Sequence, residues 1–346
     1  MSKKWMAGAA FALATVMLAG CGSNNNSGNS GQASGGDSGD GKTYTMRVGH
    51  TLTPISPRHA ILEKFKETVE AETDGKLVVE LYHSSSIGDN NQLLQAVPLG
   101  TIEAAVQPTS FFGGVQPKLS VLDLPFVFTD MKQIERFALS EASDELLATL
   151  EEKGMTGLAL WPLGIQQLTS NKPIATPDEL KGQKFRTMGT PIQLELFSNW
   201  GTSPTPIALT ELYSSLQQGV IDGQSNDIGT VHDAKLYEVQ KQMLLTNHGA
   251  IIDLFYVNKA WFASLPSEYQ EVLKNVAKNL VTERTEEELK VIDEKRTTII
   301  ELQQMQIQVP APDMLDWLKA QGEPVVEDFK AKNSDLVPIL EAILNS

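Results

Sequence analysis

The sequence contains a single cysteine and none of the short motifs that identify common enzyme classes. With only Cys21, the chain can form no internal disulfide and no zinc site built from several cysteines. Its five histidines do not occur in HExxH or another metal-binding spacing. The patterns GxSxG and GxGxxG are also absent. These absences favour ligand binding without covalent chemistry, so we predict no catalytic residues, no cofactor and no metal.

Positive charge is scarce as well. The sequence has 28 Lys and Arg against 43 Asp and Glu, a formal net charge of −15, which argues against a nucleic-acid partner. An anionic ligand would therefore need a local cation. After the N-terminal region, roughly 300 residues remain, and this is enough for two α/β lobes of ordinary size.

No segment is apolar for long enough to span a membrane. The apolar run 5–18 is shorter than the roughly 20 residues required. It follows Lys3 and Lys4 and ends in small residues, as a secretory signal does. Leu-Ala-Gly-Cys21 resembles a bacterial lipobox, in which the cysteine is lipidated. We therefore expect a signal peptide over 1–20 and a lipid anchor on Cys21, with the protein held outside the cytoplasmic membrane or in the periplasm.

Residues 21–42 are nearly all Gly, Ser, Asn and Asp, a composition that predicts a flexible tether. Within and just beyond it, 36–43 matches the phosphate-loop pattern GxxxxGK[ST]. A real phosphate loop follows a strand and opens a helix, whereas this one follows low-complexity sequence and precedes the β-branched run 44–48. We reject nucleotide binding.

The globular part opens with a predicted strand, helix and strand. Residues 44–48 form the first strand, and Ser56-Pro57 supplies an N-cap and a favoured first helical residue. Apolar residues then recur at helical spacing until Asp74-Gly75, and 76–82 forms the second strand. This order favours a parallel sheet.

Two segments can be superimposed with their glycines aligned, 92–107 and 211–226. In each, an amphipathic helix ends at a glycine and a short strand follows. The repeat predicts two lobes of similar construction. It places Gln107 and Asn226 at equivalent positions, just beyond the carboxyl ends of strands, where open α/β sheets bind ligands.

Arg186 lies at the centre of a predicted strand, 184–188. A capping box at Thr176-Pro-Asp-Glu179 starts the short helix that leads into this strand. A half-buried guanidinium requires a negative partner, either a protein carboxylate or a ligand. The residues alone leave both possibilities open.

A long helix is predicted near the C-terminal end of the chain. From Pro266 to Gln308 there is no glycine and no interior proline. This length exceeds that of most globular helices. The segment either breaks near its charged middle, 283–290, or runs across both lobes as a spine.

Several segments together resemble the solute-binding proteins of tripartite ATP-independent periplasmic (TRAP) transporters, the DctP-type family. The segments occur in the order typical of the family and span nearly all of the chain after the tether. They are Ser84-Ser-Ser-Ile-Gly88 with Gln92-Leu-Leu, Leu122-Asp-Leu-Pro-Phe-Val-Phe128, Pro173 to Arg186, Glu211 to Gln224, and Tyr237-Glu-Val-Gln-Lys241.

The resemblance implies a two-lobed, periplasmic-binding-protein-like α/β fold with a ligand cleft between the lobes and a long helix bracing both. The predicted lobe I comprises 43–164 and 253–292, and lobe II comprises 165–252 and 293–346. The implied function is to capture an organic acid anion, such as a sugar acid, and to deliver it to a membrane permease. We expect a monomer.

The resemblance also implies the binding residues. Arg186 matches the arginine that pairs with the ligand carboxylate in this family, and Asn226 matches an asparagine that bonds the ligand. Gln107 and His50 match positions that commonly line the cleft. Glu211 completes this candidate set.

Two further positions depart from the family pattern. Leu209 stands where an aromatic ring is common, and Gln166 stands where many members have a second arginine. We count both among the ligand-binding candidates. A neutral amide in place of a cation favours a monocarboxylate bearing hydroxyls.

Three alternatives remain open from the sequence. One is an exported α/β enzyme with an unrecognised site, and another is a lipoprotein that senses a ligand without transporting it. The third is a binding protein of an ATP-dependent transporter, against which the segments LKGQKFR and GVIDGQ argue.

Overall fold

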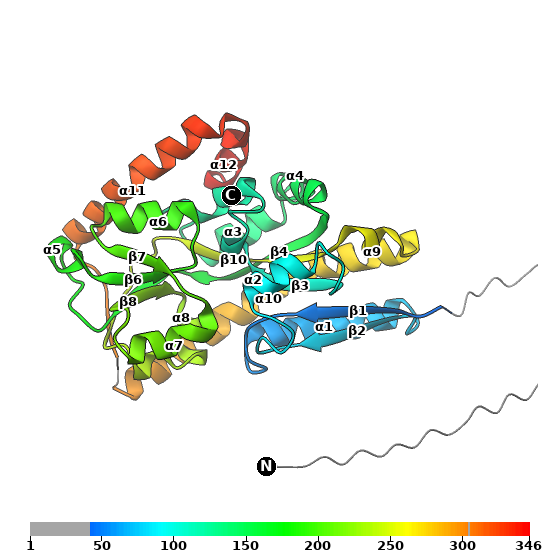
Figure 1. Cartoon of the computed structure of the whole chain (residues 1–346), viewed down its shortest axis with the longest axis horizontal. Coiled ribbons are helices and arrows are strands. Elements are labelled where there is room, and N and C mark those ends of the chain that lie inside the picture. Colours follow the sequence, from blue (N-terminus) through cyan, green and yellow to red (C-terminus); the bar gives the residue numbers. More distant parts are fainter. Residues whose placement is uncertain (1–41, 304) are drawn as a thin grey trace, which may run out of the picture. The chain divides into compact units, whose positions relative to one another are not determined.

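The computed structural model describes residues 42–303 and 305–346, which belong to one compact unit, Gly41–Ser346 (Figure 1). The predicted signal peptide, Cys21 and nearly all of the predicted tether lie outside the described residues. No helix in the described part is both long enough and apolar enough to cross a bilayer.

The first sheet contains five strands in the order β2-β1-β3-β10-β4. Its strands are β1 (Tyr44–Gly49), β2 (Leu77–Tyr82), β3 (Ala104–Pro108), β4 (Met155–Ile165) and β10 (Ala250–Asn258). β1 pairs in parallel with β2 and β3, whereas β10 runs antiparallel to β3 and β4. The predicted parallel opening is therefore confirmed, and all nine residues of β10, which lies between β3 and β4, are buried.

Helices and short 3-10 turns follow the strands of the first sheet. They are α1 (Pro57–Glu72), α2 (Asn90–Ala96), α3 (Met131–Ala138), α4 (Glu141–Ala148), α9 (Lys259–Ala263), η1 (Thr109–Phe111), η2 (Pro117–Asp123) and η3 (Thr149–Lys153). As predicted, Ser56 caps α1, because its side chain accepts a hydrogen bond from the amide of His59. The helix buries Ile61, Leu62 and Phe65 in the core of this half.

The second sheet contains six strands in the order β11-β9-β5-β8-β6-β7. Its strands are β5 (Gln167–Ser170), β6 (Lys184–Thr187), β7 (Ser203–Pro206), β8 (Gly223–Asn226), β9 (Gln242–Leu244) and β11 (Gln306–Gln308). The helices and turn between them are α5 (Pro177–Leu180), α6 (Pro191–Asn199), α7 (Leu209–Gln217), α8 (Ile228–Asp233) and η4 (Leu236–Glu238).

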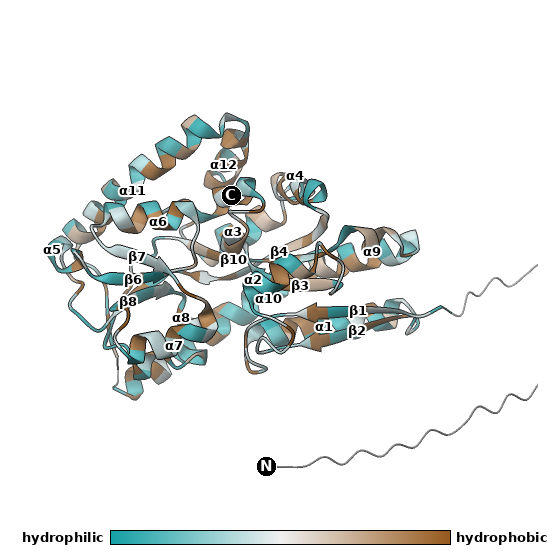
Figure 2. Cartoon of the chain, viewed as in Figure 1, coloured by the Kyte–Doolittle hydropathy of each residue, from teal (hydrophilic) through white to brown (hydrophobic). Residues whose placement is uncertain are grey.

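Strand β8 is hydrophilic along its length, yet all four of its residues are buried (Figure 2). A buried strand made of Gly, Gln, Ser and Asn gains little from the hydrophobic effect. Its side chains must instead be hydrogen-bonded, or they must face a ligand.

The two aligned segments have the predicted construction. α2 precedes Gly100, whose φ is +74°, and α7 precedes Gly219, whose φ is +69°. This left-handed conformation favours glycine at the end of a helix. The strands β3 and β8 then begin within a few residues, so the expected repeat is present in both halves.

The helix α10 (Ser267–Glu301) runs unbroken through its charged middle. Of the two possibilities, the sequence therefore forms a spine. Leu273 and Val276 belong to the core of the first half, and Ile299 belongs to the core around α7 and α8. After α10 come β11, α11 (Pro312–Lys332), η5 (Ser334–Leu336) and α12 (Val337–Leu344). α11 packs on α6, and α12 packs on α3 and α4.

A buried carboxyl in the first half gives a pH prediction. Asp123, the last residue of η2, accepts a hydrogen bond from the Ser110 hydroxyl. Burial raises the pKa of Asp123 from 3.8 to about 7, although the bond from Ser110 opposes this shift. Between about pH 4 and pH 7 the folded form retains a proton that the unfolded form has lost, so the free energy of unfolding falls as pH rises.

We therefore expect Asp123→Asn to remove that fall. Melting curves at pH 5 and pH 8 should show the variant gaining stability relative to the wild type at the higher pH, by a few kcal/mol at most. Identical pH dependence in the two proteins would contradict a raised pKa at Asp123.

Candidate functional site

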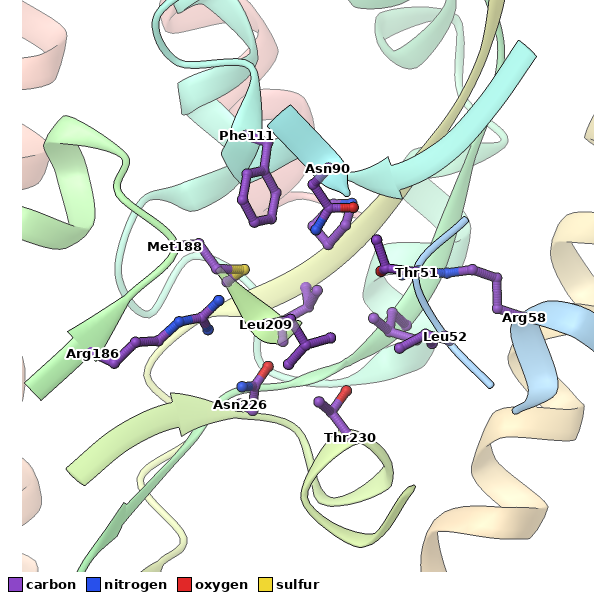
Figure 3. A pocket seen from close by; sticks show the side chains of 13 residues that line it. Thr51, Leu52, Arg58, Asn90, Phe111, Arg186, Met188, Leu209, Asn226 and Thr230 are labelled. Atoms are coloured by element: carbon purple, nitrogen blue, oxygen red, sulfur yellow. The ribbon is translucent and has the colours of Figure 1, made fainter. Parts of the chain in front are cut away.

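A cavity lies between the two sheets and is lined by residues from both (Figure 3). The non-atom space that its walls outline is about 320 Å³, part of which is open to solvent. The lining residues are Thr51, Leu52, Arg58, Asn90, Pro108, Phe111, Leu163, Arg186, Met188, Leu209, Asn226, Thr230 and Ile251.

Arg186 enters the cavity from β6 with its side chain almost fully buried, at 1% exposed (Figure 3). Its Nε donates to the carbonyl oxygen of Ile207 at 2.8 Å, which fixes the guanidinium. Its Nη1 is buried and has no hydrogen-bond partner among residues 42–303 and 305–346. No salt bridge to Arg186 forms within the same ranges. Burial lowers the pKa of Arg186 to about 10, so the group remains charged at neutral pH.

Asn226 lies at the end of β8, beside Arg186 in Figure 3. Its Nδ2 donates to Oε1 of Gln224 at 2.6 Å, and this bond holds the amide in place at the cavity. Leu209, the first residue of α7, contributes an apolar wall together with Met188 and Phe111. The structure thus brings three predicted residues together: Arg186, Asn226 and Leu209.

Arg58 also lines the cavity, although sequence reasoning did not select it. It forms a buried pair with Asp253 of β10, Nε to Oδ2 at 2.7 Å and Nη2 to Oδ1 at 2.5 Å. The side chains of Arg58 and Asp253 are 1% and 0% exposed. A signal was present in the sequence, because Arg58 lies in the first turn of a helix, where the macrodipole disfavours a cation. Such a position calls for a nearby carboxylate.

Other polar groups at the cavity were missed as well. Asn90, the first residue of α2, is buried, and its Oδ1 lacks a hydrogen-bond partner in the part of the chain that the structure describes. Thr51 follows β1, and Thr230 belongs to α8. The Thr230 hydroxyl donates to Asp227 at 2.6 Å, which fixes its orientation.

His50 and Gln107 are buried but do not line the cavity, unlike the expectation from sequence. Nε2 of His50 bonds Nδ1 of His59 at 3.1 Å, and the cavity is reached by Thr51. Burial, and next the positive charge of Arg58, lowers the pKa of His50 to about 2. Gln107 lies one residue before Pro108, which lines the cavity, and successive strand residues face opposite sides of a sheet.

Gln166 and Glu211 are not at the cavity either. Oε1 of Gln166 accepts from the Ser225 hydroxyl at 3.2 Å. Because Ser225 and Asn226 are neighbours on β8, Gln166 lies on the face of the sheet away from Asn226. Glu211 is exposed in the first turn of α7.

Within the described ranges, no three His, Cys, Asp or Glu side chains are arranged to hold a metal ion. The lining of the cavity offers a fixed cation, amides and hydroxyls on an apolar background. The only uncompensated charge found among the described lining residues is that of Arg186.

The side chain of Asp227, the residue after Asn226, is packed against Gly164 of β4. A Cβ at position 164 would lie 2.3 Å from Cβ of Asp227. We expect Gly164→Ala to cost about 1–3 kcal/mol of stability and to weaken ligand binding at the cavity, because Asp227 must shift and Asn226 with it. Urea denaturation and calorimetric titration measure the two effects.

Gly114→Ala is the matched control for Gly164→Ala, because a Cβ at position 114 would meet nothing within 4 Å. That variant should differ from the wild type by less than about 0.5 kcal/mol. Equal effects of the two alanines would contradict the proposed role of close packing at Gly164.

The sequence profile DctP, described as bacterial extracellular solute-binding protein, family 7, matches residues 48–333. The 2,3-diketo-L-gulonate-binding periplasmic protein YiaO of Escherichia coli is 31% identical over 263 residues, covering 75% of this chain and 80% of that protein. The C4-dicarboxylate-binding periplasmic protein DctP of Vibrio cholerae is 30% identical over 251 residues, covering 72% and 76%.

A solved structure has a similar fold. It is a TRAP periplasmic solute-binding protein from Desulfovibrio salexigens with bound orotic acid. The two chains superpose with a TM-score of 0.84 at 29% sequence identity, and the match covers 88% of this chain and 99% of the other.

Proposed function

The chain belongs to the DctP family of bacterial extracellular solute-binding proteins, the solute-binding proteins of TRAP transporters, and we propose that it captures an organic acid anion with Arg186 as the carboxylate-binding residue. The family and the two-lobed α/β fold agree with what the sequence motifs implied. By name, the two relatives from Escherichia coli and Vibrio cholerae bind 2,3-diketo-L-gulonate and C4-dicarboxylates. We propose that this chain binds the group that those ligands have in common, a carboxylate on a small polar molecule.

The observation that carries the proposal is the buried Nη1 of Arg186, for which the described residues supply no hydrogen-bond partner. An uncompensated buried charge is costly, so the site favours an anion that can enter it. A guanidinium matches a carboxylate in charge and in geometry, and their hydrogen bonds are stronger than bonds between neutral groups. Asn226 supplies an amide at the same cavity, and Leu209 contributes apolar surface to it.

Binding is proposed to couple to closure of the two halves around the ligand. Arg186 and Asn226 belong to the second sheet, whereas Arg58 and Asn90 belong to the first half, so a ligand that contacts both sides favours the closed form. The proposal includes no bond making or breaking. The closed complex would dock on a membrane permease and release the acid there.

We also propose that the mature protein is a monomer anchored by a lipid on Cys21. Support comes from the lipobox-like sequence Leu-Ala-Gly-Cys21 that ends the apolar run. Cys21→Ser should release the protein from the membrane fraction of expressing cells, whereas the wild type should remain with it. An unchanged membrane fraction would contradict the lipid anchor and leave the binding proposal intact.

A thermal-shift screen of organic acids tests the binding proposal. A ligand at a hundred times its dissociation constant adds roughly 2.7 kcal/mol of stability, which a melting curve detects. The screen should include C4 to C6 monoacids, diacids and sugar acids, with the corresponding neutral sugars as controls. A protein stabilised by neutral sugars and by none of the acids would contradict carboxylate capture.

A further inference from the structure

Two arginines reach the same cavity from opposite sides, and their electrostatic states differ (Figure 3). Arg186, from the second sheet, has no acidic partner in the described part of the chain. Arg58, from α1, is compensated by two hydrogen bonds to Asp253. The described lining groups therefore present one net positive charge and not two.

The compensated arginine still has hydrogen-bonding capacity. Nη1 of Arg58 is buried and has no partner among the described residues, and the same is true of Oδ1 of Asn90. One group is a donor and the other is an acceptor. A hydroxyl can satisfy both kinds of group, because it accepts through its lone pairs and donates through its proton.

From these contacts we propose that the Arg58–Asp253 pair is a specificity determinant that selects an acid bearing a distal hydroxyl over a diacid of the same length. This inference rests on the proposed function, since it assumes that the first carboxylate binds at Arg186. A second carboxylate would be desolvated on entering the cavity, and it would meet a guanidinium already neutralised by Asp253. An ionised carboxylate also has no hydrogen to donate in a hydrogen bond to Oδ1 of Asn90.

The test uses pairs of acids in which a terminal CH₂OH group is replaced by a carboxylate. The pairs are 4-hydroxybutyrate with succinate, D-gluconate with D-glucarate, and D-galactonate with galactarate. Calorimetric titration gives each dissociation constant at one fixed pH and salt concentration. We expect the wild type to bind at least one hydroxy acid about tenfold or more tightly than its diacid partner.

Two variants assign this preference to the pair. Asp253→Asn keeps an acceptor oxygen but removes the negative charge, so the ratio should move about tenfold or more toward the diacid. The double variant Arg58→Met with Asp253→Leu preserves net charge and replaces both partners, which buried pairs often tolerate. It should weaken the hydroxy acid about tenfold while Arg186 still binds both acids of the pair.

A second arginine–carboxylate pair supplies the matched control. Arg47 bonds Glu103 at 2.7 Å, and neither residue lines the cavity. Glu103→Gln should leave every affinity ratio unchanged. Circular dichroism and melting temperature establish that each variant is folded, and if Asp253→Asn is not folded, the double variant decides.

The inference is overturned if the wild type binds the diacid as tightly as the hydroxy acid in every pair, or if the folded double variant keeps the wild-type affinity for the hydroxy acid. Carboxylate capture would survive either result, because Arg186→Ala would still lose both acids. A wild type that binds none of the six acids would overturn the inference and count against the proposed function as well.

Discussion

Replacing Arg186 with alanine is expected to weaken binding of the best acid at least about a hundredfold, or about 2.8 kcal/mol, while the melting temperature of the ligand-free protein hardly changes. The affinity falls because the charged, bidentate partner of the carboxylate is lost. The ligand-free stability changes little because two effects oppose each other. Alanine leaves a cavity, but it also removes a buried charge that has no partner in the described part of the protein.

Calorimetric titration and melting curves of the same samples measure both quantities. Arg186→Lys keeps the charge but not the planar fork, so we expect it to bind the acid more weakly than the wild type and more tightly than the alanine variant. Arg47→Ala, outside the cavity, is the control for removing a cation and should not change the affinity. A collapse of ligand-free stability in Arg186→Ala would instead indicate an internal ion pair.

Asp253→Ala is expected to have the largest effect on stability, a loss of about 3–5 kcal/mol. The substitution leaves Arg58 charged, 1% exposed and without the carboxylate that accepts from its Nε and Nη2. Most of this loss arises from the unpaired buried charge of Arg58 and less from the lost hydrogen bonds. A buried cation without its carboxylate is solvated neither by water nor by a protein acceptor. Urea denaturation of the ligand-free protein measures it.

The double variant Arg58→Met with Asp253→Leu separates these two causes. Because it removes both charges, it should recover most of the stability that Asp253→Ala loses. Glu103→Ala breaks the more exposed Arg47 pair and should cost only about 1 kcal/mol or less. If the double variant is as unstable as Asp253→Ala, packing around β10 and not the stranded charge determines the loss.

Local patterns were sufficient to predict much of the fold. The cap at Ser56, the glycines after α2 and α7, and the presence of a long helix after Pro266 depend on interactions between residues close in sequence, although the sequence left open whether that helix breaks. Local patterns do not predict how the elements assemble into two halves, because strands such as β10 pair with partners far away in the chain. The two-lobed fold was instead predicted from the order of the family motifs along the sequence. The predicted lobe boundaries remain predictions.

The candidate site was predicted only in part, for a reason that lies in strand geometry. Arg186 and Asn226 were each predicted from a family motif that includes or adjoins the residue, and both line the cavity. Gln107 was predicted to lie just beyond a strand and Gln166 to replace a family arginine, but neither lines the cavity. A shift of one residue along a strand moves a side chain to the opposite face of the sheet. The position of a residue in the sequence does not by itself show which face its side chain occupies.

Arg58 was missed because its buried position depends on the ion pair with Asp253, which is 195 residues away in the sequence. Neither residue belongs to a motif that was selected, and a single arginine at a helix start has many possible partners. The long-range pairing of β10 with β3 and β4 places Asp253 in the half that contains α1. Only the folded chain reveals that the two form a pair.

The central claim is that a ligand supplies the counter-charge that Arg186 lacks among residues 42–303 and 305–346. A crystal structure with the tightest-binding acid tests this directly. We predict carboxylate oxygens about 2.7–2.9 Å from the guanidinium nitrogens of Arg186, including Nη1. An acid bound elsewhere, with Arg186 paired to an Asp or Glu of the protein itself, would contradict the account.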